Sequence, residues 1–512
     1  MKNKHFLLLT AGLILTVACS LSPKTITLIH SNDTHGIYKP YKIKINGSER
    51  LVGGMIASNH YISQIREREP NSLLIDTGDI STGSLASEIE YKGLAGGVMI
   101  EFLNLLGYDI WCFGNHDFDK GQENALALAS QAKFPTVMAN IVYQKTGQPF
   151  PVEPYHIFTL SGLRIGVIAV MEENFLMEVS KKSIEGLEVK PIIPTLESFI
   201  PVLDKKTDLI VVLAHTWFDE GLRIAQNIPG IDAVLVASED GKFREVNGVP
   251  VQSTYGHQRT LGYLKLKVEK DRVVSYEHRL IWLWADIDLK AASPIMALIE
   301  EVDSSIASEY GRVIGRVKTD MPLKNQFVKT TSVENAIGDW ITDAMRWKTG
   351  AQIGFYNSGG IRAEIRAGPI TKAEVFNVVP FHNTLVVFKL SAQQLKNALE
   401  YDIERGWDRL QVSGLNYKYY SKEAKPYGQR IDYLEINGDI IVKQGRVVKP
   451  NEQFTVVSND YVAEHAADKY FNFEVTNSQN TGFFLYQTLV EWLQKHRLLN
   501  YSLQQRIVQI IE

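Results

Sequence analysis

The stretch TITLIHSNDTHG, residues 25–36, is an apolar run that ends in a cluster of polar side chains. The same pattern occurs in SLLIDTGD (72–79), IWCFGNHDFD (110–119) and LIVVLAH (209–215). Short apolar runs rich in β-branched residues are typical of buried strands. In α/β folds, active sites form where such strands end. The four runs therefore predict an α/β domain with a functional site at its strand ends.

Helical patterns separate these strands and continue beyond them. Residues 92–107 and 121–133 are expected to be helices between strands, and residues 293–312 a connecting helix. Further on, a helix over 333–347 and a strand ending at Asn357 are expected to open a second unit. We therefore predict three parts: a first domain over 25–290, a linker helix over 291–325, and a second domain over 326–512.

Composition narrows the class of protein. The chain has 512 residues, of which 45% are hydrophobic and 22% charged, as in ordinary globular proteins. At about 100–200 residues per domain, two or three domains are expected. The formal net charge of -4 provides no basic field for a nucleic-acid polymer, so we expect none as a partner. The chain is expected to be a monomer.

The N-terminus has the pattern of an export signal. Lys2 and Lys4 precede an apolar stretch, Phe6 to Ala18, that is short for a membrane span. The run ends in LTVAC, which resembles a bacterial lipobox with Cys19 as the lipidated residue. We expect residues 1–19 to form a signal peptide with a lipobox. The mature protein is then expected to be a lipoprotein on the periplasmic or outer face of a bacterial membrane. Ordinary cleavage and an uncleaved anchor are the alternatives.

The polar clusters have the composition of a metal centre. They supply carboxylates, imidazoles and one amide oxygen, which suit hard to borderline divalent ions better than ions that prefer sulfur. In Asp33-x-His35, two side chains two residues apart on an extended segment point the same way. Taken singly, each could be a solvated loop residue or a hydrogen-bonded core histidine. The candidates are Asp33, His35, Asp79, Asn115, His116, Asp119 and His215.

The chain resembles the 5'-nucleotidases and UDP-sugar hydrolases. The resemblance rests on SNDTHG (31–36), DTGD (76–79), GNHDFD (114–119), AHTWFDEG (214–221) and NSGGIR (357–362), and spans about residues 25–475. It implies a four-layer calcineurin-like metallophosphoesterase β-sandwich with flanking helices. A helix is expected to join this domain to a smaller mixed α/β nucleotide-recognition domain.

The resemblance also implies roles for residues of the first domain. One divalent ion would be held by Asp33, His35 and Asp79, and a second by Asp79, Asn115 and His215, where the ions are Mn, Zn, Fe, Co or Mg. Such a pair clamps a phosphate and activates water for attack on phosphorus. The catalytic residues would be His116, which donates to the phosphoryl oxygens or the leaving group, and Asp119, which orients it. The alternative for Asp119 is a helix N-cap.

One motif departs from the family. Where relatives have a strand ending in Gly-His-x-His or Gly-His-x-Gln, this chain has VASEDG (236–241), which places Ser238 and Asp240 at the two ligand positions. Asp240 is a sound ligand for a hard cation, whereas a serine hydroxyl is a poor one. Glu239, water or His257 are open as substitutes, although His257 aligns with a basic surface position.

The second domain is expected to bind the substrate. The resemblance implies that Asn357 and Arg362 contact the nucleotide, while Arg366 is read as a surface residue. The aromatic motif followed by Gly-Gly-Asp-Gly is degenerate, with Tyr461 at the stacking position and Asp468 at the acidic one. A partner ring is expected within RGWDRLQVSG (405–414), where Trp407 is the aromatic candidate and Arg409 the alternative.

The leading functional prediction is an exported, metal-dependent phosphohydrolase that releases phosphate from nucleotides in nucleotide catabolism or salvage. Ser238 motivates a second hypothesis, a catalytically weakened relative that binds nucleotide or acts as a surface interaction protein. Within the enzyme class, a 2',3'-cyclic-nucleotide phosphodiesterase or a UDP-sugar hydrolase is a further alternative.

Overall fold

The computed structural model describes residues 23–45, 47–174, 179–269, 271–290, 292–323 and 333–511. The predicted signal segment and Cys19 lie outside these residues. Within them, no helix combines the length and the apolar character that crossing a membrane requires.

The first domain contains two six-stranded sheets, which we call sheet A and sheet B. The order in sheet A is β18-β17-β1-β4-β7-β8, and in sheet B it is β10-β11-β13-β14-β16-β15. The strands of sheet A are β1 (Lys24–Ser31), β4 (Ser72–Asp76), β7 (Ile110–Cys112), β8 (Thr136–Val137), β17 (Thr260–Glu269) and β18 (Arg272–Trp282). Those of sheet B are β10 (Tyr155–Leu160), β11 (Leu163–Met171), β13 (Leu209–His215), β14 (Ala233–Val236), β15 (Phe243–Val246) and β16 (Val249–Ser253).

Helices and short hairpins complete this domain. The helices are α1 (Met55–Arg68), α2 (Gly97–Leu106), α3 (Gln122–Gln131), α5 (Ile192–Asp204) and α6 (Phe218–Asn227), with 3₁₀ turns at η1 (Leu85–Ser87) and η2 (Asn115–Phe118). The remaining strands are β2 (Tyr41–Ile45), β3 (Ser48–Val52), β5 (Glu90–Tyr91), β6 (Leu94–Ala95), β9 (Ile141–Tyr143) and β12 (Leu187–Val189). The predicted strands at 25–29, 72–75, 110–113 and 209–213 are confirmed.

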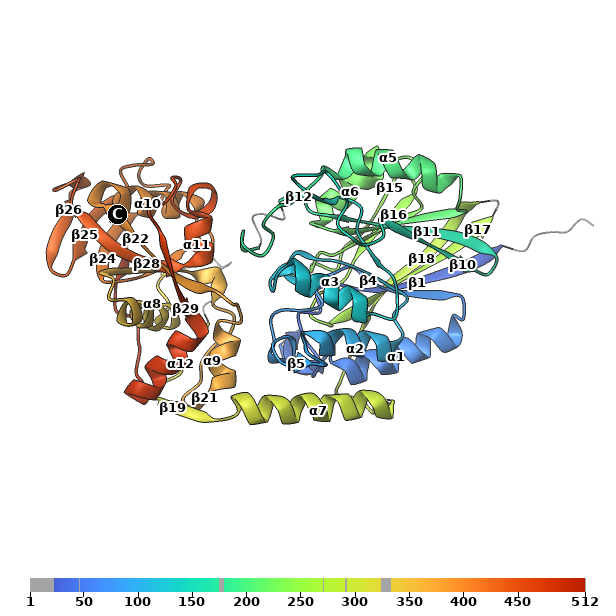
Figure 1. Cartoon of the computed structure of the whole chain (residues 1–512), viewed down its shortest axis with the longest axis horizontal. Helices are drawn as coiled ribbons and strands as arrows, with labels where there is room; N and C mark the ends of the chain where they lie inside the picture. The colour runs from blue at the N-terminus through green and yellow to red at the C-terminus, as the bar shows by residue number, and fades with distance from the viewer. Residues whose placement is uncertain are drawn as a thin grey trace, which may run out of the picture.

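The sheets stack face to face, with helices on both outer sides. In β13, Leu209, Val211 and Leu213 belong to the core between the sheets. The alternate residues Ile210, Val212 and Ala214 belong to a second core that includes α5 and α6. Because side chains alternate across a strand, both faces of β13 are buried and its sequence is continuously apolar. Figure 1 shows the resulting layers, with α5 and α6 on one side and α1 and α2 on the other. The predicted four-layer sandwich is confirmed.

Strand direction locates the functional end of this domain. In sheet A, β1, β4, β7 and β8 run parallel, and in sheet B, β11, β13, β14 and β16 run parallel. The carboxyl ends of parallel strands meet at one edge of a sheet. The polar clusters that follow β1, β4, β7, β13, β14 and β16 are therefore brought together.

One predicted helix begins later than expected. Residues 92–107 do not form one continuous helix, because β5 and β6 make a short hairpin before α2 begins at Gly97. Gly93 and Gly96 have φ values of 79° and 74°, which lie in the left-handed region. A glycine in this conformation ends or precedes a helix rather than continuing it.

The predicted connecting helix exists as α7 (Ser293–Tyr310), and it packs on the first domain through Ile295, Leu298 and Val302. The following strand, β19 (Val313–Val317), pairs with β21 (Gly368–Thr371) and β30 (Leu498–Leu499) of the second domain. The residues of β19 fall within the predicted linker, 291–325, and form part of a sheet with strands of the second domain. The sequence pattern did not reveal this strand, because the apolar content of residues 313–317 is similar to that of the predicted helix before them.

The second domain contains three further sheets. Their orders are β23-β20-β28-β22-β29, β27-β26-β25-β24-β31 and β21-β19-β30. Besides β19, the strands are β20 (Ile353–Asn357), β21 (Gly368–Thr371), β22 (Thr384–Ser391), β23 (Leu410–Ser413), β24 (Leu415–Tyr420), β25 (Ile431–Ile436), β26 (Asp439–Lys443), β27 (Arg446–Val447), β28 (Gln453–Asn459), β29 (Gln479–Phe484), β30 (Leu498–Leu499) and β31 (Ile507–Ile510).

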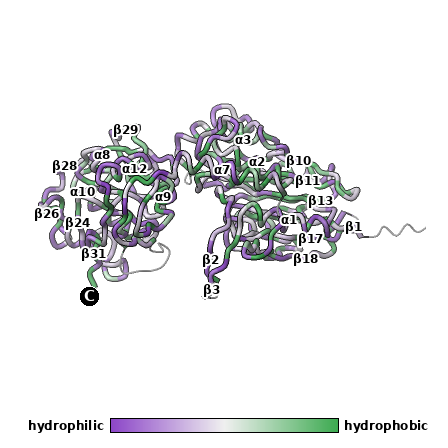
Figure 2. Tube along the Cα trace, turned by 90° about the horizontal axis from the view of Figure 1, so that it is seen from below, coloured by the Kyte–Doolittle hydropathy of each residue, from purple (hydrophilic) through white to green (hydrophobic). Residues whose placement is uncertain are grey.

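Helices cover these sheets and divide the domain into two cores. They are α8 (Ala336–Thr349), α9 (Lys372–Val378), α10 (Ala392–Arg405), α11 (Asp460–Glu464) and α12 (Leu485–His496), with a 3₁₀ turn at η3 (Ser358–Gly360) and a π-helical turn at Ala466–Tyr470. One core lies around α10 and the other around α8 and α12. Figures 1 and 2 show the domains as two lobes, with the β2–β3 hairpin projecting from the first lobe in Figure 2.

Candidate active site

The loops after β1 and β4 and the end of β13 bring three side chains together. The ligand atoms of Asp33, Asp79 and His215 all lie within 4.8 Å of one another, and all three residues are buried. His215 Nε2 lies 3.4 Å from Asp79 Oδ2 and 3.1 Å from the Asn115 side-chain oxygen. The Nδ1 atom of His215 donates to the Thr77 carbonyl at 2.8 Å, which directs Nε2 toward the cluster.

Two glycines allow this close approach. A Cβ at Gly114 would lie 2.1 Å from Asp79 Oδ1 and 2.4 Å from the His215 ring, and one at Gly78 would lie 2.6 Å from His215 Nδ1. Asp33 and Asp79 themselves have positive φ values of 50° and 56°. Non-glycine residues adopt this conformation at an energetic cost, and they concentrate at functional sites.

The cluster has strong electrostatic interactions. Burial raises the pKa of Asp33 well above its usual range, and the carboxylate of Asp79 adds to the rise. Against the effect of burial, Asp79 and Asp33 raise the pKa of His215 to about 10. Two buried carboxylates at this separation repel each other, so the site favours a positive charge between them.

Asp117 organises the loops beneath the cluster and was not identified from the sequence. Its Oδ2 accepts hydrogen bonds from the backbone N–H groups of Asp79 and Gly114, both at 2.9 Å. Its Oδ1 accepts from the N–H groups of Ile80 and Ser81 at 3.2 Å and from the Ser81 hydroxyl at 3.0 Å. Asp117 lies within the GNHDFD motif, and that position was the only sequence signal available for it.

His116 and Asp119 form a hydrogen-bonded pair at the mouth of the cluster. The His116 Nδ1 atom donates to Asp119 Oδ2 at 2.9 Å, and the backbone N–H of His116 donates to Asp79 Oδ1 at 2.8 Å. Although burial favours the neutral ring, Asp119 and Asp79 raise the pKa of His116 to about 9. Asp119 ends the η2 turn, whereas the N-cap of α3 is Gly121, so the N-cap alternative for Asp119 is wrong.

A second cluster lies beside the first. The ligand atoms of His35, Glu239 and His257 lie within 4.8 Å of one another. His35 Nε2 is also 3.9 Å from both Asp33 Oδ1 and Asp79 Oδ2, so the two clusters adjoin. His257, which aligns with a basic surface position of the family, lies beside His35, because the loop after β16 places the two rings with centroids 5.2 Å apart.

The structure does not bring Asp240 to either cluster. Its carboxylate pairs with Lys242 and accepts a hydrogen bond from the Ser253 hydroxyl at 2.9 Å. It lines a separate small pocket of about 280 Å³ behind Trp217. Glu239 lines the main pocket, whereas Ser238 lines both pockets.

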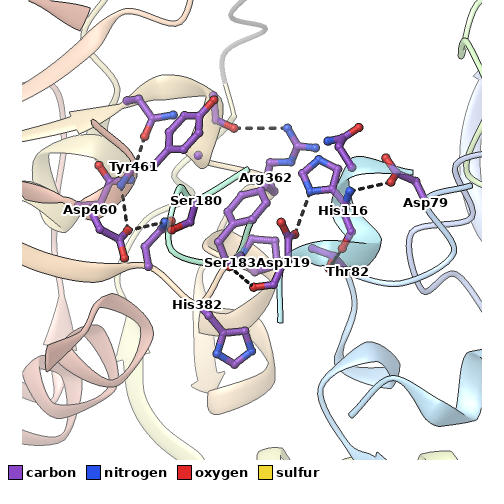
Figure 3. A pocket seen from close by; sticks show the side chains of 18 of the residues that line it. Asp79, Thr82, His116, Asp119, Ser180, Ser183, Arg362, His382, Asp460 and Tyr461 are labelled. Atoms are coloured by element: carbon purple, nitrogen blue, oxygen red, sulfur yellow. Dashed lines mark hydrogen bonds and ion pairs between the residues drawn. The ribbon is translucent and has the colours of Figure 1, made fainter. Parts of the chain in front are cut away.

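The second domain contributes the opposite wall of the main pocket. Asn357 and Arg362, the predicted substrate-binding residues, line it. The Arg362 guanidinium lies 5.6 Å from the Phe381 ring centroid, and Phe381 in turn lies 6.3 Å from the His116 ring. Figure 3 shows Arg362 beside His116 and Asp119, with Tyr461 and Asp460 on the far side. The pocket therefore reaches from the His116–Asp119 pair to the second domain.

Two aromatic side chains stand at the far end of this pocket, with a lysine against them. Trp407 is 49% exposed and lines the pocket together with Tyr461. The Lys469 ammonium lies 5.4 Å from the Trp407 ring centroid and 4.9 Å from that of Tyr461, and it donates to the Tyr461 hydroxyl at 2.6 Å. The alternative stacking group Arg409 is instead bound to Asp402 in the core.

Asp468, predicted at the acidic substrate position, does not line the pocket. Its side chain is 38% exposed and lies 3.6 Å from His465 Nδ1. The π-helical turn Ala466–Tyr470 makes hydrogen bonds five residues apart, as in Phe471 N–H to the Ala466 carbonyl. The wider turn changes which side chains face inward, and Lys469 takes the place at the pocket.

The main pocket has a volume of about 800 Å³ and lies between the domains. A loop of the first domain closes one side, where the Ser180 hydroxyl and the Lys181 N–H donate to Glu464 of α11 at 3.1 and 2.9 Å. The Ser183 hydroxyl donates to the Asp119 carbonyl at 3.0 Å. A cavity of this size accommodates a small organic ligand.

Comparison with known proteins assigns the family. Residues 26–257 match the calcineurin-like phosphoesterase family, and residues 313–473 match the 5'-nucleotidase C-terminal domain. The chain belongs to the 5'-nucleotidase family. This is a family of phosphoesterase hydrolases.

Individual relatives of this 5'-nucleotidase family member extend over most of its length. Human 5'-nucleotidase is 27% identical over 517 residues, covering 88% of this chain and 86% of the relative. The trifunctional nucleotide phosphoesterase protein YfkN of Bacillus subtilis is 26% identical over 92% of this chain, which spans only 34% of that protein. The crystal structure of a 5'-nucleotidase precursor from Thermus thermophilus has a TM-score of 0.77 at 24% identity, covers 96% of this chain and all of its own, and shows the same fold.

The donor atoms of the site fit the divalent ions that the family implies. Asp33 and Asp79 offer carboxylate oxygens, Asn115 an amide oxygen, and His35 and His215 imidazole nitrogens. Burial lowers the pKa of His35 to about 3, which keeps its ring neutral. Neutral imidazole is the form in which His35 would bind a metal.

We expect Asp117→Ala to lower the free energy of unfolding by about 3–5 kcal/mol in urea denaturation, because it leaves four buried backbone donors without an acceptor. Asp119→Ala, which removes the acceptor of one partly exposed hydrogen bond from the charged His116 ring, is the matched control and should cost less, about 1.5–3 kcal/mol. Equal losses in the two variants would contradict the organising role of Asp117.

Proposed function

We propose that the protein is a divalent-metal-dependent phosphohydrolase that releases phosphate from nucleotides. The observation that carries this proposal is the shared pocket: the Asp33–Asp79–His215 cluster and the His116–Asp119 pair face Asn357 and Arg362 across one cavity. Phosphoryl transfer depends mainly on positioning and on stabilising charge. The first domain supplies groups for the reaction, and the second supplies groups that bind the ester.

The metal-binding residues of the proposal are Asp33, His35, Asp79, Asn115 and His215. When bound, the divalent ions supply Lewis-acid charge for the phosphate and a nucleophile generated from water. Asp79 lies between His35 and His215, 3.9 and 3.4 Å from their Nε2 atoms, and so contacts both halves of the centre.

His116 is proposed as the proton donor. Asp119 accepts the hydrogen bond from Nδ1, which holds the ring in one orientation and directs Nε2 to the pocket. Arg362 and Asn357 are proposed to bind the nucleotide, with the planar guanidinium of Arg362 suited to phosphate oxygens. A ring of the substrate would extend toward Trp407 and Tyr461.

Ser238 supports a second candidate, a relative that binds nucleotide with little turnover. Its hydroxyl stands at a metal-ligand position of the family, and a neutral hydroxyl binds divalent ions weakly. Export and lipid attachment at Cys19 are also proposed, from the sequence alone. They would limit membrane contact to a lipid anchor and place the activity outside the cytoplasm, where it would serve nucleotide scavenging.

The first test incubates the purified protein with AMP, UDP-glucose or 2',3'-cyclic AMP. Phosphate release is measured separately with Mn²⁺, Zn²⁺, Co²⁺ and Mg²⁺. We expect AMP hydrolysis with at least one ion and its loss in EDTA, because the cluster needs a cation to act. Preference for either of the other substrates would assign those activities instead. Nucleotide binding without turnover under every ion would support the second candidate and contradict hydrolysis.

We expect His116→Ala to lower kcat for AMP by about 10²–10⁴-fold while bound metal, measured by inductively coupled plasma mass spectrometry, stays unchanged. The control is His156→Ala, because His156 makes the same Nδ1 to carboxylate contact, at 2.9 Å with Glu153, on the surface of β10. His156→Ala should keep full activity. A His116→Ala enzyme with wild-type kcat would exclude the proton-donor role.

We expect Lys469→Ala to lower KM for AMP with little change in kcat, because the ammonium lies against both rings where a base would stack. Stacking contributes about 1–3 kcal/mol per base, so KM should fall by about tenfold. Lys418→Ala is the control, since Lys418 also lies over a tyrosine, 5.9 Å from the Tyr433 ring, and outside the pocket. A rise in KM for Lys469→Ala would instead show that Lys469 binds the substrate.

A further inference from the structure

The cluster of His35, Glu239 and His257 comes from three separate loops, after β1, β14 and β16. None of the three is adjacent in sequence to another, yet their ligand atoms lie within 4.8 Å. Glu239 Oε1 lies 3.1 Å from His257 Nε2, and Glu239 Oε2 accepts from Arg259 at 3.2 Å. A contact of this kind can be an ordinary surface ion pair rather than part of a metal site. The local backbone distinguishes these two possibilities.

The backbone at His257 is built for close approach. A Cβ at Gly256 would lie 2.8 Å from Glu239 Cγ and 3.0 Å from Asp33 Cβ, so only glycine fits there without movement. The N–H of His257 donates to the Asp33 carbonyl at 2.6 Å, which ties the loop after β16 to the loop after β1. The position of His257 is therefore set by the same segment that carries Asp33.

His257 also shares a conformational feature with the residues of the first cluster. Its φ is 59°, beside 50° at Asp33, 47° at His35 and 56° at Asp79. Left-handed backbone at four non-glycine residues around one centre carries an energetic cost that a surface ion pair does not require. The adjacent Gln258, with φ 55°, is held by a hydrogen bond from the Ser58 hydroxyl at 2.9 Å.

The ring orientation of His35 leaves one nitrogen for this cluster. Its Nδ1 lies 3.3 Å from the Thr82 carbonyl, to which it donates, so Nε2 is the unprotonated atom. That atom lies 3.9 Å from Asp33 Oδ1 and from Asp79 Oδ2, and a ring nitrogen of His35 lies within 4.8 Å of the ligand atoms of Glu239 and His257. Asp240, the metal ligand predicted from the sequence, is bound instead to Lys242 and Ser253 outside the main pocket.

We propose that Glu239 and His257 are metal ligands, which together with His35 hold the first divalent cation in place of the family ligand absent from the end of β14. This inference rests on the proposed metal-dependent function. Two imidazoles and a carboxylate, next to the carboxylates of Asp33 and Asp79, form an oxygen-rich and nitrogen-rich shell that suits Mn²⁺, Fe²⁺ or Co²⁺.

The test measures Mn²⁺ binding rather than activity. Isothermal titration with Mn²⁺, and metal content after dialysis, are compared for the wild type, Glu239→Gln, His257→Ala and the matched control Asp240→Asn. The wild type should bind about two ions per chain. Glu239→Gln and His257→Ala should lose one ion or weaken one site at least about tenfold, whereas Asp240→Asn should keep both sites.

Measurements of folding and one conservative variant serve as controls for the metal-binding test. Circular dichroism and thermal midpoints establish that each variant is folded, and Glu239→Asp should recover part of the lost affinity because it retains a carboxylate. Two tightly held ions in both Glu239→Gln and His257→Ala would overturn the inference, as would loss of an ion only in Asp240→Asn. If the wild type binds two ions and the variants lose one, but no phosphoester is hydrolysed, the site stands and the proposed hydrolysis fails.

Discussion

The active centre depends on holding two buried carboxylates, Asp33 and Asp79, within reach of one imidazole, His215. Burial and mutual repulsion oppose this arrangement. The protein sustains it with positive φ values at both aspartates, with glycines at 78 and 114, and with Asp117, which binds the surrounding backbone N–H groups. This arrangement of charge and backbone is accounted for when a cation lies among the side chains, and that requirement links the fold to the proposed chemistry.

The residues that each domain contributes to the pocket follow from where its strands end. The parallel strands of both sheets in the first domain present their carboxyl ends to one edge, and the second domain faces that edge with Asn357, Arg362 and Phe381. Contacts of Glu464 with Ser180 and Lys181, and of His382 with Glu88, join the two walls. Residues of both domains line the pocket, so the proposed substrate would contact both domains at once.

Most of the first-domain site could be predicted from the motifs, because the carboxyl ends of parallel strands converge whatever the details of the loops. This rule brought together Asp33, His35, Asp79, Asn115, His116 and His215. It failed at the end of β14, where a turn sends Asp240 toward Lys242 and leaves Glu239 at the pocket. It failed again at Asp468, because a π-helical turn is not visible in an apolar pattern. Side-chain positions that depend on a single turn, rather than on strand direction, could be determined only from the structure.

The most direct measurement is anomalous X-ray diffraction from crystals of the protein soaked in Mn²⁺. The account predicts two anomalous peaks, one among Asp33, Asp79 and His215 and one against His35, Glu239 and His257. A single peak beside Asp240, or no peak at either cluster, would contradict it.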